Sequence, residues 1–519
     1  METIVNKLCS VRRGKMSVYL QVLENLFSFE LLLVCGLGAL IGIILGAIPG
    51  MNGGIGVVVV LPFTYTMDPA TGILFLGSIY MSSAVGGSIS GILINVPGTV
   101  ESAPTAIEGN AMTKLGRAKE ALYYAGISSA IGGAFGVVIL IFFTPFLAAQ
   151  SVKFGPTEML LIAICGLTIV GSITGKSLLK GIFAALLGLT FAMVGISDTT
   201  GEVRFTFGST SLMEGIELIP VVIGFYAITE MIKQALELKN RGKIDNNIDL
   251  GNNKIRPIFK NIIGKYRVQL AKSSILGNLI GILPGAGGAI AAFLAYGEAK
   301  RSSNEKEQFG KGSPAGIVAT ESANNAAVGG AMVPMLALGI PGSSTTAIMF
   351  GALMIHGLIP GPRLFTEHGT IAYTFVFGML LAVLFMCIIS LAGVPLFTKI
   401  LKIKMEYIIP AVLVFSFIGA YSVRNSMFDV VIALSCGIIG VLFYKMEIPT
   451  TPIILGIILG PLVESNLVRT LTITGAQDVS LAQYIFTRPI SMIIIAVTLY
   501  LIYVNYKAIR KEKLDYSNR

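Results

Sequence analysis

The chain has 519 residues, of which 54% are hydrophobic and 13% are charged, and its formal net charge is +10. Soluble proteins carry about 25% charged residues, and a soluble core could not hide this many apolar segments from water. Nucleic-acid binding is excluded as well, because no basic segment with interleaved aromatic residues is present. The composition predicts an all-α polytopic integral membrane protein with about 12 membrane segments, some of them broken or re-entrant.

Cysteine and histidine usage argues against a metal centre. The five cysteines are scattered without a Cys-x-x-Cys pair, and the chain has two histidines. We therefore expect neither a disulfide framework nor a metal site, with Na⁺ as the one possible bound metal ion.

Charge divides the chain into five parts. Basic residues beside membrane helices face the cytoplasm as a rule, so both termini and the linker are expected there. The parts are a basic lead-in at 1–30, a first half at 31–232, a linker at 233–272, a second half at 273–506 and a basic tail at 507–519.

Proline and glycine interrupt the apolar segments that open each half. Leu31–Ile48 ends at Pro49 and Gly50, and the second half breaks in the same way at Pro284 and Gly285. We predict helix breaks at these four residues. Unbroken scaffold spans are expected at 121–148, 157–175, 178–196, 212–232, 370–397, 408–422, 427–444, 448–463 and 488–506.

The two halves have proline and glycine at matching positions, which indicates an internal duplication. The alternative to a duplication is that the glycines match only because Gly-x-x-x-Gly spacing is common wherever membrane helices pack. At a constant offset of 235 residues, Gly42, Gly46, Pro49, Gly50 and Gly53 match Gly277, Gly281, Pro284, Gly285 and Gly288. Further on, Ala84–Gly87 is aligned with Ala327–Gly330, Pro97-Gly98 with Pro341-Gly342, and Thr105–Ile107 with Thr346–Ile348.

Loop charge predicts that the repeats are inverted. The loop Thr64–Gly72 has no Lys or Arg, whereas the matching loop of the second half has Lys300, Arg301, Lys306 and Lys311. After the second Pro-Gly pair the difference in Lys and Arg content is reversed, because there the loop of the first half carries the basic residues. Opposite bias at matching positions is the pattern of inverted repeats. A basic segment precedes each repeat, however, and both segments are expected on the cytoplasmic side. Inverted repeats start on opposite sides of the membrane, so one half needs an extra crossing or a re-entrant hairpin.

Helices broken near the bilayer midplane expose backbone groups that can bind a solute. Half-helix N-termini suit a carboxylate, and unwound carbonyl groups suit Na⁺. A simple kink is the alternative for each Pro-Gly pair, but adjacent amides in an apolar segment are costly without a partner. The predicted substrate-binding residues are Asn95, Pro97, Gly98, Thr99, Thr105, Asn324, Asn325, Pro341, Gly342, Ser343, Thr345 and Thr346.

Few acidic residues lie within the apolar regions, and these are the candidates for ion coupling. Glu108 and Glu321 could bind a proton or cation, or could be structural. Asn324 and Asn325 complete the candidate set for the coupling ion. Glu101 is another intramembrane acid, and Glu464 is interpreted as an interface or structural residue.

No enzyme motif is found. The Ser343–Thr346 segment has no histidine or lysine placed as a base, and no phosphate-binding Gly-rich motif follows a strand. The alternatives to a transporter are a channel or membrane scaffold without coupled transport, and an intramembrane enzyme. Duplicated broken helices with amides and hydroxyls favour the transporter.

The motifs resemble the large membrane subunit of the tripartite tricarboxylate transporters. The resemblance runs in order along essentially the whole chain and is densest at Leu338–Pro362. Further matching segments are Gly46–Gly50, Asn95–Thr99, Thr105–Gly109, the L-P-G-A-G at Leu283, Glu321–Ala326, Gly460–Arg469 and Arg488–Ile490.

This resemblance implies secondary uptake of a carboxylate across the bacterial cytoplasmic membrane, driven by Na⁺ or H⁺. It also implies two partners, a small membrane subunit and an extracytoplasmic solute-binding protein. The sequence departs from the family at Glu108, where Asp is usual, and at Ala111, where Pro is common. The longer acid leaves the coupling ion and the exact carboxylate open.

Overall fold

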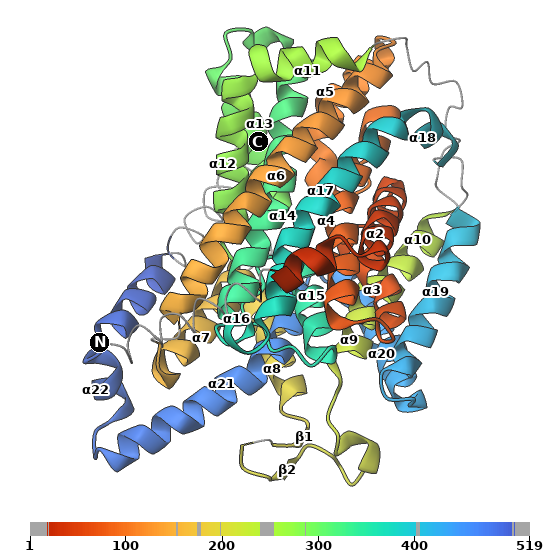
Figure 1. Cartoon of the computed structure of the whole chain (residues 1–519). Helices are drawn as coiled ribbons and strands as arrows, with labels where there is room; N and C mark the ends of the chain where they lie inside the picture. The colour runs from red at the N-terminus through yellow and green to blue at the C-terminus, as the bar shows by residue number, and fades with distance from the viewer. Residues whose placement is uncertain are drawn as a thin grey trace, which may run out of the picture.

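A computed structural model describes residues 18, 20–151, 154–173, 178–197, 199–238, 254–285, 287–400, 405–500 and 503. It is almost entirely helical, which confirms the predicted all-α fold (Figure 1). Most of the basic lead-in, the central part of the linker and the basic tail lie outside the described residues.

The first half runs from α2 to α10. Its core elements are α2 (Phe29–Ala47), α3 (Gly53–Val60), η1 (Leu61–Thr64), α4 (Pro69–Ile94), η2 (Val100–Ser102), α5 (Ala103–Lys114) and α6 (Ala118–Ser151). Its outer elements are α7 (Pro156–Ile173), α8 (Leu178–Ala192), β1 (Gly195–Ile196), β2 (Val203–Arg204), η3 (Thr210–Leu212), α9 (Leu218–Val222), η4 (Ile223–Ile228) and α10 (Thr229–Glu237).

The second half has equivalent core helices in the same order. Its core elements are α11 (Ile255–Gly264), α12 (Arg267–Ile282), α13 (Gly287–Ser302), η6 (Lys306–Gln308), α14 (Pro314–Leu338), α15 (Ser344–Ile355), α16 (Leu364–Glu367) and α17 (Gly369–Ala392). Of these, α12, α13, α14 and α15 correspond to α2, α3, α4 and α5. The outer elements are α18 (Val394–Ile400), α19 (Met405–Ser422), α20 (Met427–Lys445), α21 (Thr451–Ala476) and α22 (Leu481–Phe486).

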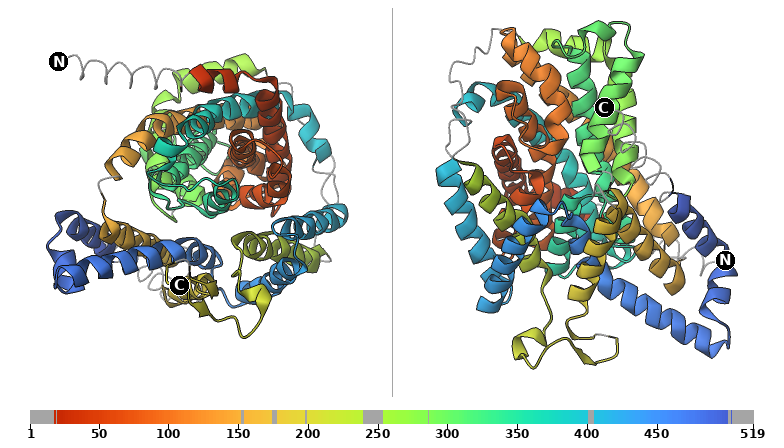
Figure 2. Two further views of the ribbon diagram at one scale, coloured as in Figure 1. Left: turned by 60° about the horizontal axis from the view of Figure 1, so that its bottom comes forward. Right: turned by 180° about the vertical axis from the view of Figure 1, so that it is seen from behind.

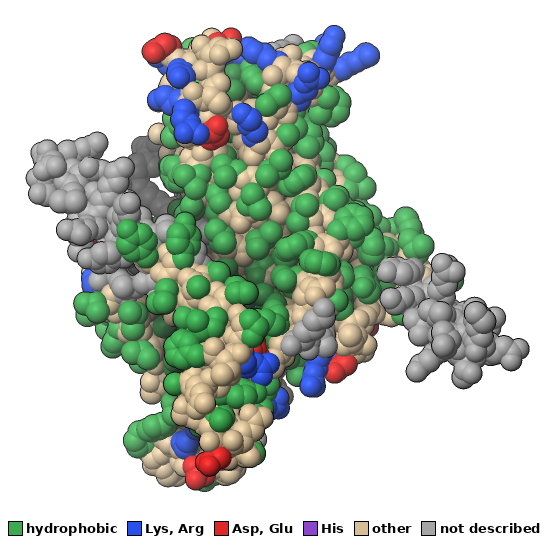
Figure 3. Space-filling view, turned by 90° about the vertical axis from the view of Figure 1, so that its left-hand side faces the viewer, with side chains coloured by type: hydrophobic (Ala, Val, Ile, Leu, Met, Phe, Trp, Pro, Cys, Tyr) green, Lys and Arg blue, Asp and Glu red, His purple; other side chains and the backbone are tan. Residues whose placement is uncertain are grey.

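Within the described residues, eight helices are long and apolar enough to cross a membrane. Apolar side chains cover the middle of the surface, where they would contact lipid (Figure 3). Shorter apolar helices, among them α3 and α15, supply the broken segments. The long helices are α2, α4, α6, α9–α10, α17, α19, α20 and α21.

Helices α4 and α14 form the centre of the molecule, and small residues let other helices pack directly on their backbones. A Cβ added to Gly42 would collide with Ile79 of α4, at 3.0 Å from its Cα atom. Gly277 lies against Ala323 of α14 in the same way. Such close approach explains why Gly, Ser and Ala crowd these segments, because packing rather than the hydrophobic effect joins helices in lipid.

Equivalent backbone contacts in the two halves establish the register of the duplication. Gly86 packs on Ile43, and Gly330 packs on Asn278. Asn278 is the equivalent of Ile43 at the offset of 235 residues. Gly86 therefore corresponds to Gly330, an offset of 244 residues, which also pairs Gly98 with Gly342. The predicted alignment of Ala84–Gly87 is thus wrong by one residue. That of Thr105–Ile107 is wrong by three, since the offset of 244 pairs Ser102 with Thr346.

Matching connections of the two halves lie at opposite ends of the molecule. The α3–α4 connection contacts the end of α15, where the His356 ring lies 3.2 Å from the Thr64 hydroxyl. The α13–α14 connection contacts α5 instead, through hydrogen bonds from Gly310 and Ser313 to Glu108. Lys and Arg side chains gather at this second end (Figure 3). We call it the basic end.

The described part of the lead-in lies away from the basic end. Asn25 donates to Thr374 at 3.4 Å, and Thr370 donates to Gln21 at 3.3 Å, both near the start of α17. Helix α17 begins after the connection that contacts α3 and α4. Residues 20–28 and the basic loops therefore lie at different places along the molecule.

The outer helices form two groups beside the core. One group combines α7 and α8 with α21, and the other combines α9, η4 and α10 with α19 and α20 (Figure 2, left). Each group therefore contains helices from both halves. The β1–β2 hairpin projects from the end opposite the basic end (Figure 1). Arg204 of β2 anchors it to Glu464 of α21 through two hydrogen bonds of 2.9 and 3.0 Å.

Candidate functional site

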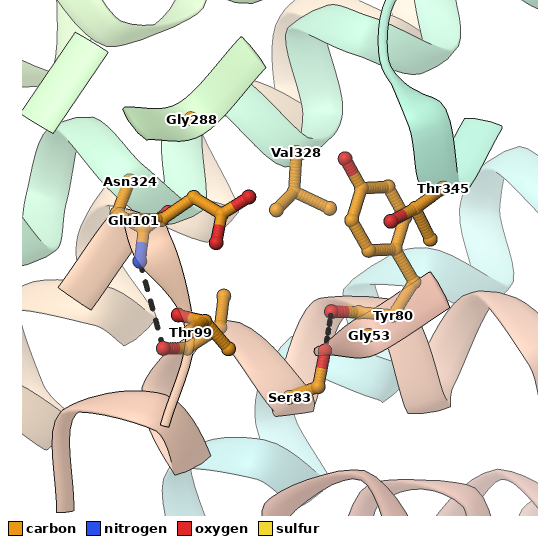
Figure 4. Close-up of a pocket in the computed structure, with 10 residues that line it drawn as sticks. Gly53, Tyr80, Ser83, Thr99, Glu101, Gly288, Asn324, Val328 and Thr345 are labelled. Carbon is orange, nitrogen blue, oxygen red and sulfur yellow. Dashed lines mark hydrogen bonds between the residues drawn. The ribbon is translucent and has the colours of Figure 1, made fainter. Parts of the chain in front are cut away.

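A small polar cavity lies where the broken helices of the two halves meet. Its volume is about 20 Å³, which is room for about one water molecule or small cation and too little for a tricarboxylate. Both halves contribute to its wall (Figure 4). The lining residues are Gly53, Tyr80, Ser83, Ala84, Thr99, Glu101, Gly288, Asn324, Val328 and Thr345.

Equivalent positions of the two halves face each other across this cavity. Gly53 and Gly288 are related by the offset of 235 residues. The offset of 244 residues relates three further pairs of lining residues, which places the cavity on the approximate symmetry axis of the duplication. These pairs are Tyr80 with Asn324, Ala84 with Val328, and Glu101 with Thr345.

Four helical segments begin at the cavity. Gly53 is the first residue of α3, and Gly288 and Thr345 are the second residues of α13 and α15. Thr99 is the N-cap of η2, which continues directly into α5. The first turn of a helix has unpaired N–H groups and a partial positive charge. The wall is therefore polarised to favour an anion, although the chain has no basic residue among the lining positions described.

Reciprocal capping fixes the two segments that follow the second Pro-Gly breaks. Ser343 donates its N–H to the Thr346 hydroxyl at 2.7 Å, and Thr346 returns its N–H to the Ser343 hydroxyl at 3.2 Å. The first half has a matching capping box at Thr99 and Ser102. The Tyr80 hydroxyl lies 3.1 Å from the Ser343 hydroxyl and so connects α4 to the start of α15. These bonds position the helix ends at the cavity.

The predicted substrate-binding residues divide into several groups. Thr99, Asn324 and Thr345 line the cavity. Ser343 and Thr346 are the capping pair just described, and Pro97, Gly98, Pro341 and Gly342 form the breaks before the two capped segments. Asn95 ends α4 in a left-handed conformation with φ of 57° and is exposed, so it is a helix cap outside the cavity lining.

The predicted helix breaks lie between the members of each opening hairpin. Pro49 and Gly50 separate α2 from α3, and Pro284 and Gly285 separate α12 from α13. Both glycines have positive φ, 87° for Gly50 and 81° for Gly285, a conformation that glycine adopts without strain.

Asn325 is buried beside the cavity rather than in its wall. Its side-chain NH₂ donates to the Met81 carbonyl oxygen at 3.0 Å. Its side-chain oxygen is buried and has no hydrogen-bond partner among the described residues. Asn324 and Asn325 are thus adjacent in sequence but face different surroundings.

Glu321 is fully buried in a cluster of hydroxyl groups. Ser88 and Thr105 donate to one carboxylate oxygen, both at 2.5 Å, and Ser129 donates to the other at 2.7 Å. These donors come from α4, α5 and α6, so the carboxylate joins three helices to α14. This arrangement explains Thr105 and Glu321 as a buried polar network, outside the cavity lining.

Glu108 holds the connection between α13 and α14. One oxygen accepts from the Tyr296 hydroxyl at 2.7 Å, and the other accepts from the backbone N–H groups of Gly312 at 2.9 Å and Ser313 at 2.7 Å. The N–H of Gly310 adds a fourth bond of 2.6 Å. The contacts favour the structural alternative for this acid.

Sequence reasoning missed Tyr80, Ser83 and the importance of Glu101. Glu101 stands two residues after Thr99, and its equivalent is Thr345, which was predicted. The correct offset of 244 residues would have identified it. The predicted alignment of Thr105 with Thr346 concealed this relationship.

The fold and the cavity together define a polytopic helical membrane protein with two related halves that meet at a polar site. Residues 32–455 match the Tripartite tricarboxylate transporter TctA family. The chain therefore belongs to this family, whose members are transporter membrane subunits and not enzymes, and the resemblance seen in the motifs is confirmed.

Two proteins of Agrobacterium vitis are similar to the chain. The first, described as "Uncharacterized 52.8 kDa protein in TAR-I ttuC' 3'region", is 33% identical over 467 residues, which cover 90% of the chain and 91% of that protein. The second, "Uncharacterized protein in TAR-II ttuC' 3'region", is 34% identical over 215 residues, which cover 41% of the chain and 87% of that protein.

Proposed function

We propose that the chain is the permease subunit of a secondary uptake system for a di- or tricarboxylate such as citrate. A Na⁺ or H⁺ gradient drives symport across the bacterial cytoplasmic membrane. An extracytoplasmic solute-binding protein delivers the substrate, and a small membrane subunit completes the complex. Membership of the TctA family supports this assignment.

The observation that carries the proposal is the meeting of four helix starts from both halves at one cavity. Transporters place substrate sites where broken helices of two repeats face each other near the midplane. The polarised wall suits a carboxylate. We infer that the halves are inverted repeats, because their matching connections lie at opposite ends. We also infer that the basic end faces the cytoplasm.

Transport then requires the two halves to move relative to each other. A cavity of about 20 Å³ holds about one water molecule, so a tricarboxylate enters and leaves only when the site widens toward one face of the membrane. The Pro-Gly breaks lie between the moving helices, and the outer groups, which contain helices from both halves, support them.

Uptake into proteoliposomes tests the proposal. The chain is reconstituted with its small membrane subunit and its binding protein, and labelled citrate, succinate and tartrate are supplied under separate Na⁺ and pH gradients. Accumulation of one carboxylate above its external concentration under one gradient supports coupled transport. Equilibration without accumulation would favour a channel, and no uptake of any carboxylate would overturn the proposal.

A further inference from the structure

One lining residue of the cavity carries a carboxylate. Glu101 lies in the first turn of η2, and the equivalent position of the second half is Thr345. Among the described lining residues, the two halves of the site therefore differ in charge by this one acidic side chain. The carboxylate points into the cavity in Figure 4.

The side chain of Glu101 lies beside the start of α13. A Cβ atom built on Gly288 would be 3.0 Å from Cγ of Glu101 and 2.8 Å from the amide oxygen of Asn324. Glycine at this position thus leaves room for the acid and the amide together. The carboxylate lies at the positive end of a 16-residue helix and next to a neutral oxygen ligand.

The other ionisable groups near Glu101 have different partners. Tyr80 faces it from α4. On α14 the nearest acid is Glu321, which accepts hydrogen bonds from three hydroxyls, and on α5 it is Glu108, which holds the α13–α14 connection. The first two turns of α13 carry no charged residue. Among the described lining residues, no Lys or Arg offsets the charge of Glu101.

This position creates a conflict with an anionic substrate. The helix starts favour a carboxylate from the substrate, yet a carboxylate of the protein already occupies the same small cavity. Two like charges a few ångströms apart repel strongly where water is scarce. A proton on Glu101, or a monovalent cation bound beside it, removes the repulsion. The oxygens of Glu101, Asn324 and Thr345 are hard ligands of the kind that suits Na⁺.

We propose that Glu101 is the coupling residue of this transporter, at which the driving cation, Na⁺ or H⁺, must bind before the cavity accepts a substrate carboxylate. The inference rests on the proposed function and specifies its mechanism. It replaces Glu108 and Glu321 as the acid that senses the ion, because those two are held by bonds that do not involve the cavity.

The test measures cation binding without substrate. The purified full-length chain is melted in detergent over a range of Na⁺ concentrations, with K⁺ as the ionic-strength control, and separately over a range of pH. A ligand that binds the folded protein raises its melting temperature. We expect wild type to be stabilised by Na⁺ or by acid, and the Glu101→Gln variant to lose that response.

Two further variants keep the test decisive. Glu298→Gln is the matched control, since this acid lies on α13 outside the cavity and pairs with Arg301 at the surface; it must keep the wild-type response. Glu101→Asp retains the charge and is expected to keep a weakened response, which covers the case in which Glu101→Gln does not fold. An unchanged response in Glu101→Gln, or no response to either cation in wild type, overturns the inference.

A measurement of citrate binding distinguishes failure of this inference from failure of the proposed function. Wild type is expected to bind labelled citrate only with Na⁺ or at low pH, and Glu101→Gln to bind it without either. If wild type accumulates carboxylates in proteoliposomes while Glu101→Gln keeps the wild-type cation dependence, the coupling role of Glu101 fails alone. If wild type accumulates none, the proposed function fails.

Discussion

The backbone N–H of Gly50 donates to the carbonyl oxygen of Gly98 at 3.2 Å, and this bond joins the two Pro-Gly breaks of the first half. The second half repeats it between Gly285 and Gly342 at 2.9 Å. Unpaired backbone groups cost several kcal/mol within a membrane. Each break therefore supplies the hydrogen-bond partner that the other lacks, and the two broken segments stabilise each other.

Substituting Gly98 should disrupt this junction. In the Gly98→Ala variant the new Cβ would collide with the carbonyl oxygen of Gly46 and lie 2.9 Å from the Cα atom of Gly87. Neither backbone atom can rotate away, so we expect a loss of stability of about 1–3 kcal/mol or more. The melting temperature in detergent and the yield of monodisperse protein measure this effect.

Gly297→Ala is the control for that substitution. Gly297 lies inside α13, and a Cβ added there meets nothing within 4 Å. Alanine is favoured over glycine in a helix by about 1 kcal/mol, so the melting temperature should stay the same or rise. Equal losses in both variants would show that the close contact at Gly98 does not matter.

The adjacent amides of α14 should separate binding from stability. Asn324→Ala removes a lining residue of the cavity, so carboxylate uptake should fall at least about tenfold, the result of losing about 1.4 kcal/mol of binding. Its melting temperature should fall less than that of Asn325→Ala, because Asn324 borders the cavity and its bond to the Ala84 carbonyl oxygen is long, at 3.5 Å. Asn325→Ala removes the bond to Met81 and leaves a void, so it should melt earlier and retain more uptake. The reverse pattern would place the site at Asn325.

Glu321 should be required for folding through its oxygens more than through its charge. Glu321→Ala leaves the hydroxyls of Ser88, Thr105 and Ser129 without their acceptor. We expect a loss of about 2–5 kcal/mol. Glu321→Gln should melt much closer to wild type, because the amide oxygen still accepts two bonds and the Ser129 hydroxyl can rotate to accept one. If Glu321→Ala melts like wild type, the buried network has no structural role.

Glu108 should control the accessibility of the α13–α14 connection. In Glu108→Gln an NH₂ group replaces one oxygen, so at least one of the three backbone N–H groups that Glu108 binds loses its acceptor. Trypsin should then cleave faster at Lys306 or Lys311, which flank the released backbone. Tyr296→Phe, which removes one of the four bonds, should show a smaller increase. Cleavage at the wild-type rate in Glu108→Gln would exclude this role.

The sequence predicts the membrane class, the breaks and the duplication because these depend on local composition. Pro and Gly in an apolar segment interrupt a helix wherever it lies, and Gly42 and Gly277 mark the same close contact. The all-α polytopic fold is confirmed by the structure. Helix α5 is not among the predicted spans, because its 12 residues are largely polar and so short a helix depends on packing, here against α4 and α6.

The site was only partly predictable because it depends on which segments meet across the duplication. Pattern alone cannot distinguish Asn324, which lines the cavity, from Asn325, which faces Met81 one position later. Nor does composition separate Glu101 from Glu108, although one enters the cavity and the other binds a loop. An offset wrong by three residues hid the equivalence of Glu101 and Thr345.

Cysteine labelling tests the inferred orientation of the molecule. Lys114 and Lys306 are exposed at the basic end, whereas Phe207 is 91% exposed near the hairpin that projects from the other end. In a background without the five native cysteines, an impermeant maleimide added outside spheroplasts should label Phe207→Cys. It should label Lys114→Cys and Lys306→Cys only after the membrane is opened. Basic residues favour the cytoplasmic side, and labelling of Lys306→Cys in intact spheroplasts would reverse the orientation.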